Sequence, residues 1–146
     1  MMSEMTINEG EIDKALNVSA DVGELNKVLA YIDERLEEAG CPLKVQMQID
    51  VAAEEIFVNI ANYAYDHDGG SVIISMDLND SPEAVISFID TGVEFDPLKK
   101  QDPDTTLSAD ERQIGGLGIY MVKRSMDQVK YKRDGDKNIL TIHKTW

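Results

Sequence analysis

Two long segments of the chain repeat apolar residues at helical spacing. The first follows Asp21-Val-Gly-Glu24, which has the acidic first position and the later glutamate of a helix capping box. Gly40 and Pro42 are typical of the end of such a helix. The second segment runs from about Leu43 to Tyr65 and is apolar over most of its circumference, which predicts a helix buried in the core.

Four shorter segments read as strands. They predict two hairpins, each closed by a short polar turn: 71–78 with 84–90, and 129–133 with 138–144. A third helix is expected between the hairpins, from Ile119 to about Asp127. Weaker strand patterns occur at 4–9 and 14–19, before the first helix.

One stretch, from Asp96 to Ile114, shows no clear period and contains two prolines and many charges. A loop of this length inside a compact domain is usually a lid or a binding loop. The chain shows no internal repeat and no linker composition. We therefore expect residues 1–146 to form a single domain with a lid at about 96–114.

Composition narrows the possible partners. The formal net charge of −14 repels nucleic-acid phosphates and anionic lipid, so neither nucleic acid nor a membrane surface is an expected partner. Cys41 is the only cysteine, which excludes an internal disulfide and suits a reducing compartment. The first residues lack the apolar region of a signal peptide, and no run is long enough to span a bilayer. These features predict a cytoplasmic protein.

A polar stripe interrupts the apolar second helix. Glu55, Asn59 and Asn62 lie at positions i, i+4 and i+7, and therefore share one face. A buried polar group without a partner costs about 1–3 kcal/mol, and a ligand would remove that cost. The amide oxygen of Asn59 suits Mg²⁺ when phosphates supply the other ligands, and Glu55 is placed to take a proton from a hydroxyl or water. Taken alone, a partly exposed helix with solvated polar residues explains the stripe better.

Two further motifs contain glycine. Asp90 ends an apolar strand, where a carboxylate can accept a hydrogen bond from an amino group such as that of adenine, and Gly92 lets a flat base approach the backbone. An ordinary strand-ending turn also explains these two residues. The sequence Gly115-Gly116-Leu117-Gly118 leads into the third helix, where free N–H groups bind phosphate, although a flexible hinge has the same composition. It is neither a Walker A motif nor a convincing Rossmann fingerprint.

The order of these motifs resembles that of the GHKL (Bergerat-fold) ATPases, and most closely their small stand-alone branch, the bacterial anti-sigma-factor serine protein kinases. The segment from Glu55 to Tyr65, EIFVNIANYAY, is similar to the N box of that branch. Asp90 to Pro97, DTGVEFDP, is similar to its second motif, and Gly115 to Ile119 to its glycine box. The resemblance runs from about Asp21 to the end of the chain.

This resemblance implies an α/β two-layer sandwich, in which a mixed, mostly antiparallel sheet carries helices on one face. ATP would bind between the helices and the lid. The implied roles are general base for Glu55, protein ligand of Mg²⁺ for Asn59, and partner of the adenine amino group for Asp90. Two positions depart from common GHKL patterns: Glu94 stands where many members have a second glycine, and Tyr63 where many relatives have histidine.

The remaining site residues follow from the same resemblance. Gly92 would lie under the adenine base. Gly116 and Gly118, with Leu117 between them, would contact the phosphates through backbone N–H groups. Asn62 is a further candidate for the pocket.

The resemblance also implies a function. It suggests a serine/threonine kinase that phosphorylates an anti-sigma-factor antagonist with a STAS-like domain, and so regulates transcription by partner switching. It further suggests a sigma factor as a second partner, and a homodimer. Two alternatives use the same fold: a non-catalytic binding switch that depends on ATP, which retention of Glu55 disfavours, and an ATP hydrolase, in which Glu55 would act on water.

Overall fold

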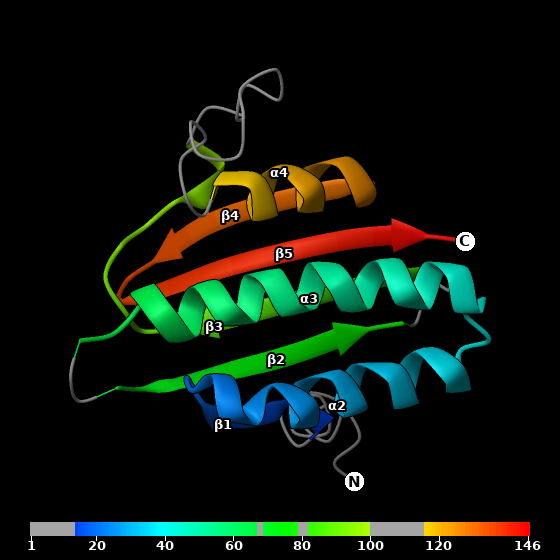
Figure 1. The fold of residues 1–146 in the computed structure, drawn as a ribbon, viewed down its shortest axis with the longest axis horizontal. Coiled ribbons are helices and arrows are strands. Elements are labelled where there is room, and N and C mark those ends of the chain that lie inside the picture. Colours follow the sequence, from blue (N-terminus) through cyan, green and yellow to red (C-terminus); the bar gives the residue numbers. More distant parts are fainter. Residues whose placement is uncertain (1–13, 67–68, 79–81, 100–115) are drawn as a thin grey trace, which may run out of the picture.

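A computed structural model describes residues 14–66, 69–78, 82–99 and 116–146 of the chain. In this part of the protein, five strands form one sheet and every strand pairing is antiparallel (Figure 1). The strands, in their order across the sheet, are β1 (Leu16–Ser19), β2 (Ser71–Asp77), β3 (Glu83–Asp90), β5 (Lys137–Thr145) and β4 (Gln128–Asp134).

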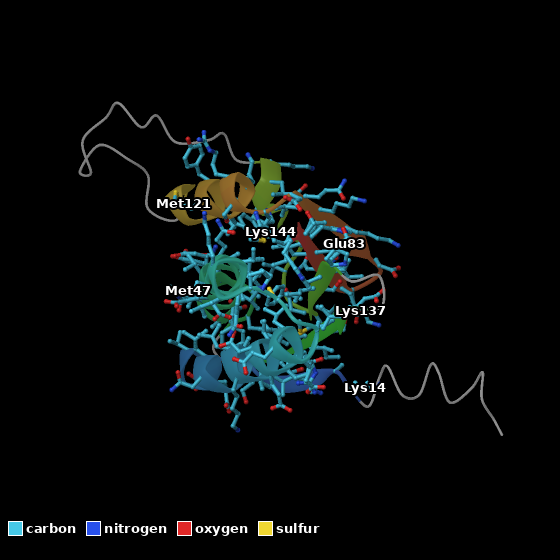
Figure 2. All side chains as sticks on the ribbon, turned by 90° about the vertical axis from the view of Figure 1, so that its right-hand side faces the viewer. Lys14, Met47, Glu83, Met121, Lys137 and Lys144 are labelled. Atoms are coloured by element: carbon cyan, nitrogen blue, oxygen red, sulfur yellow. The ribbon has the colours of Figure 1, made fainter. Side chains whose placement is uncertain are left out.

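The helices α2 (Leu25–Glu38), α3 (Leu43–Tyr63) and α4 (Gly116–Ser125) form a second layer on one face of the sheet (Figures 1 and 2). A single 3-10 turn, Val22–Glu24, precedes α2, and the carboxylate of Asp21 caps it by accepting a hydrogen bond from the N–H of Gly23 at 2.9 Å. The predicted two-layer α/β sandwich is therefore confirmed. The sheet was predicted to be mixed and mostly antiparallel, whereas its described strands are antiparallel throughout.

The boundaries of several elements differ from those expected. The strand expected at 14–19 is confirmed as β1, whereas residues 4–9 lie outside the described part, as does most of the expected lid. The third helix begins at Gly116, three residues earlier than predicted. Its first N–H groups have no helical partner in any case, so glycine is tolerated there despite its low helix propensity.

Side-chain alternation explains how a polar pair reaches the interior. On β3 every second residue is buried, and this inward-facing set ends with Phe88 and then Asp90. On β5 the inward-facing set begins at Asn138 and continues with Leu140. The register pairs Phe88 with Leu140 and Asp90 with Asn138. The two polar residues therefore lie side by side at one end of an apolar layer.

Asp33 on α2 and Asp50 on α3 are half-buried and lie close to each other. The Oδ1 atoms of Asp33 and Asp50 are both shielded from solvent, and neither has a hydrogen-bond partner among the described residues. Burial, a hydrogen bond that the protonated carboxyl of Asp50 donates to Asp33, and the charges of Asp33 and Glu37 raise the pKa of Asp50 to about 8. Because two ionised carboxylates cannot hydrogen-bond to each other, the pair retains a proton near neutral pH.

We expect Asp50→Asn to make the stability of the protein less dependent on pH. An aspartate in the unfolded chain titrates near pH 3.9. The folded state thus holds an extra proton between about pH 4 and 8, and stability falls as the pH rises through this window. From pH 6 to 8.5 the wild type should lose about 1–2 kcal/mol more than the variant, after discounting for partial exposure.

Urea unfolding followed by circular dichroism at these pH values measures the difference. The exposed Glu34 on α2 provides a control, because Glu34→Gln should leave the pH dependence of the wild type unchanged. If Asp50→Asn and wild type lose stability in parallel, the shared proton is not a feature of the folded protein.

Candidate nucleotide-binding site

One carboxylate oxygen of Asp90 accepts hydrogen bonds from the protein, and the other is available to a ligand. Asp90 is only 5% exposed. Its Oδ1 accepts hydrogen bonds from the backbone N–H of Gly92 and from Nδ2 of Asn138, both at 2.9 Å. Its Oδ2 accepts no hydrogen bond from the described residues, and Asp90 lines a pocket. This oxygen is therefore placed to accept a hydrogen bond from a ligand.

Asn138 holds this arrangement in place. Its Nδ2 donates to the backbone oxygen of Val93 at 2.8 Å as well as to Asp90. Its Oδ1 accepts from the hydroxyl of Tyr131 at 2.5 Å and from Arg133 at 3.2 Å. Because both ends of the amide are occupied, its orientation is fixed, and Nδ2 must face Asp90. Asn138 was not predicted as a site residue, although its place in the inward-facing set of β5 was a usable signal.

The pocket beside Asp90 is mainly apolar and lies between α3, the sheet and the start of α4. Its enclosed cavity measures about 60 Å³, and the hollow reaches about 500 Å³ when the open mouth is counted. Apolar walls with a single carboxylate acceptor suit an apolar ring that carries an amino group. The lining residues are Ile56, Asn59, Ile60, Tyr63, Ala64, Asp90, Val93, Phe95, Pro97, Ile119, Tyr131, Asn138 and Leu140.

Gly92 is required by a close approach of two backbone segments. A Cβ atom at this position would lie 2.1 Å from the carbonyl oxygen of Ala64, at the end of α3. That same oxygen accepts a hydrogen bond from the N–H of Val93 at 2.9 Å. The glycine thus allows the loop after β3 to pack against the end of α3. Its predicted place under the base stays a prediction.

Asn59 and Glu55, both on α3, line two different hollows of the structure. Asn59 is half-buried, lines the pocket with Asp90, and makes no hydrogen bond to the described residues. Glu55, one turn earlier, is also half-buried but lines a separate groove between α3 and α4. Asn62 is exposed and does not line the pocket, so nothing in its position supports the expected contact.

The start of α4 lies against Glu55. A Cβ atom on Gly118 would be 2.1 Å from Oε2 of Glu55, so only glycine allows the carboxylate its observed position. Gly116 is the first residue of α4 and Leu117 the second, which places this segment in the first helical turn, where N–H groups are free to bind anions. The structure thus brings the Glu55 and glycine motifs together, on one side of the pocket that holds Asp90.

Comparison with known proteins agrees with this geometry. The histidine kinase-like ATPase domain family matches residues 18–144 of the chain. The chain belongs to this family. Membership implies ATP binding. None of the helices in the described ranges has the length and apolar content needed to cross a bilayer.

Individual relatives agree with membership of this family. The chain is 26% identical over 100 residues to the serine/threonine-protein kinase BtrW of Bordetella bronchiseptica, an alignment that covers 68% of this chain and 70% of BtrW. Its fold is similar to the RsbU and RsbW domains of Rv1364c from Mycobacterium tuberculosis, with a TM-score of 0.63, 17% identity and 90% of this chain covered. The chain spans 32% of that larger protein.

A histidine kinase domain has a more distant likeness. The domain from the Erythrobacter litoralis blue-light activated histidine kinase EL346 gives a TM-score of 0.52 at 13% identity. The match covers 88% of this chain and 61% of the kinase chain. At such identities, the two solved structures establish the ATPase fold and leave the reaction open.

Tyr65 is a second residue of the ATPase domain to which the sequence analysis gave no role. Its hydroxyl donates to the backbone oxygen of Ser71 at 2.6 Å and accepts from the N–H of Thr91 at 2.8 Å. Its ring lies where a Cβ atom on Gly70 would be, at 2.2 Å. Tyr65 thereby ties the chain after α3 to the start of β2 and to the end of β3, next to Asp90.

Proposed function

We propose that this ATPase domain is an ATP-Mg-dependent serine/threonine protein kinase of the anti-sigma-factor type. The observation that carries the proposal is the placement of Glu55 and Asn59. They lie one helical turn apart on α3. Asn59 lines the pocket that contains Asp90, and the carboxylate of Glu55 lies against Gly118 in the first turn of α4. The similarity to BtrW, a serine/threonine-protein kinase, supports the same reaction.

Binding of the nucleotide follows from the pocket. Oδ2 of Asp90 would accept a hydrogen bond from the adenine amino group, and the apolar walls would cover the faces of the base. The phosphates would extend along α3 toward the first turn of α4, which begins at Gly116, and would bind the free backbone N–H groups of that turn, those of Gly116 and Gly118 among them.

Asn59 fits the role of the protein ligand to Mg²⁺. Its amide has no partner among the described residues, and those residues contain no group of three acidic, histidine or cysteine side chains that would hold a metal by itself. A metal here would take most of its ligands from phosphate oxygens and water, as Mg²⁺ commonly does. When bound, Mg²⁺ would neutralise charge on the phosphates.

Glu55 is the general base in the proposed transfer of the γ-phosphoryl group. The hydroxyl oxygen of the acceptor forms a bond to the γ-phosphorus while the bond from that phosphorus to the bridging oxygen of ADP breaks. The hydroxyl proton passes to the carboxylate of Glu55, and ADP leaves with the bridging oxygen. If water takes the place of the acceptor hydroxyl, the domain is an ATP hydrolase. If no phosphoryl transfer takes place, the domain is an ATP-dependent binding switch.

The acceptor in this proposal is a serine or threonine on an anti-sigma-factor antagonist with a STAS-like domain. A sigma factor is the second partner, and the domain works as a cytoplasmic homodimer that regulates transcription by partner switching. These partners rest on the motif resemblance described above. A pull-down from the source cell with ATP-Mg, followed by mapping of phosphorylated sites on the captured protein, tests them.

We expect Asn59→Ala to remove the effect of Mg²⁺ on ATP binding. Calorimetry with ATP should show tighter binding with Mg²⁺ than with chelator for the wild type, and equal binding for the variant, because the protein ligand to the metal is lost. Asn62→Ala is a matched control on the same helix, since Asn62 is exposed and outside the pocket. A full Mg²⁺ effect in Asn59→Ala would mean that another group holds the metal.

A further inference from the structure

Helix α3 exposes an apolar stripe next to α4. Leu43, Met47 and Val51 recur every four residues, and are 69%, 59% and 60% exposed. Met121 on α4 is 51% exposed and lines the same groove. Figure 2 shows Met47 and Met121 on the side of the helical layer that faces away from the sheet. Four large apolar side chains exposed together are typical of an interaction surface.

The groove leads to the proposed base. Glu55 is the next residue of the same stripe, four positions after Val51, and lines the end of the groove beside Gly118. At about 1.5 Å per residue, the stripe from Leu43 to Glu55 is about 18 Å long, or slightly more than three helical turns. The groove has a volume of about 600 Å³.

We propose that this groove binds the apolar face of an amphipathic helix in the substrate protein, and so holds the acceptor hydroxyl at Glu55. The inference rests on the kinase function proposed above. The argument for this occupant is continuity, because the groove and the proposed reaction centre share Glu55. The groove runs between two helices and offers side-chain ridges, which suits a helix with anchors every three or four residues.

The groove would act on the acceptor and leave the nucleotide unaffected. Its lining includes neither Asp90 nor Asn59, which belong to the other pocket. When the substrate helix is bound in the groove, its hydroxyl reacts within the complex and does not have to reach the site from solution. The effective concentration of the acceptor at Glu55 is therefore higher. Changes in the groove should therefore weaken substrate binding at constant ATP affinity.

Fluorescent peptides of about 16 residues provide the probe, a length of about 24 Å as a helix. One has a serine at its N-terminal end followed by leucines spaced three and four residues apart, and one has the serine at its C-terminal end. A third has every leucine replaced by glutamine. Anisotropy with ATP-Mg present should show that at least one leucine peptide binds the wild-type chain, and that the glutamine peptide binds at least tenfold more weakly.

Groove variants then locate the binding. Met47→Glu and Val51→Glu should each weaken binding of the leucine peptide at least tenfold, because each places a charge on the apolar stripe. Val22→Glu is the matched control, since Val22 is 46% exposed and lies outside the groove. ATP affinity should remain that of the wild type in all three. If an α3 variant fails to fold, Met121→Glu on the opposite wall of the groove replaces it, and should weaken binding of the leucine peptide in the same way.

Several results would overturn the docking site. These are wild-type binding by the folded groove variants, equal binding of the leucine and glutamine peptides, or no binding of either leucine peptide. Sedimentation that shows Met47→Glu converting a dimer to a monomer would assign the groove to a second copy of the chain. A leucine peptide that binds through the groove but receives no phosphate would leave the docking site standing and count against the kinase function.

Discussion

Asp90→Asn is expected to weaken ATP binding by about tenfold to a hundredfold, which corresponds to the loss of one hydrogen bond to a charged group. Asparagine keeps Oδ1, which can still accept from the N–H of Gly92 and from Nδ2 of Asn138. It replaces Oδ2 with an NH₂ group, which would face the amino group of adenine as a second donor. The internal hydrogen bonds should therefore survive while the ligand contact is lost.

Calorimetric titration with ATP measures this effect, and thermal melting should show that the variant remains folded. Asp134→Asn is the matched control, because Asp134 is an exposed aspartate at the end of β4 and should bind ATP as the wild type does. Unchanged ATP affinity in a folded Asp90→Asn protein would reject the assignment of this pocket to adenine.

Glu55→Gln is expected to reduce the rate of phosphoryl transfer by about a hundredfold to ten-thousandfold, the usual contribution of a general base. Glutamine has nearly the same size, and should fit against Gly118 without displacing α4. It cannot take the hydroxyl proton, so the chemical step should slow while ATP affinity stays close to that of the wild type. Rates measured in a single turnover separate this step from product release.

Glu54→Gln provides the control for this change. Glu54 is the adjacent residue on α3, is exposed, and lines neither the pocket nor the groove. Its variant should transfer phosphate at the wild-type rate. Wild-type transfer by Glu55→Gln would reject the base assignment and favour an ATP-dependent binding switch.

Much of the site could be predicted because periodic patterns place side chains within an element. Alternation along β3 puts Asp90 on the inner face, and helical spacing puts Glu55 one turn before Asn59 on α3. The order of the glycine motifs then indicated an ATP-binding fold. The placements of Asp90 and of Glu55 with Asn59 need only the geometry of a single strand or helix.

Contacts between elements could not be predicted in the same way. The pairing of Asn138 with Asp90 depends on the register of β3 against β5, which are separated in the chain by α4 and β4. The approach of Gly118 to Glu55 depends on how α4 packs on α3. Spacing alone also placed Asn62 with Asn59, although Asn62 is exposed and, unlike its neighbours Tyr63 and Ala64, does not line the pocket.

Transfer of labelled phosphate tests the central claim most directly. The wild-type chain, incubated with [γ-³²P]ATP, Mg²⁺ and the partner protein that co-purifies with it, should place label on a serine or threonine of that partner. Glu55→Gln should leave the partner near background, and Glu54→Gln should match the wild type. An unlabelled partner in the presence of wild-type protein that binds ATP would contradict the kinase assignment, as would release of free phosphate at the same rate with and without the partner.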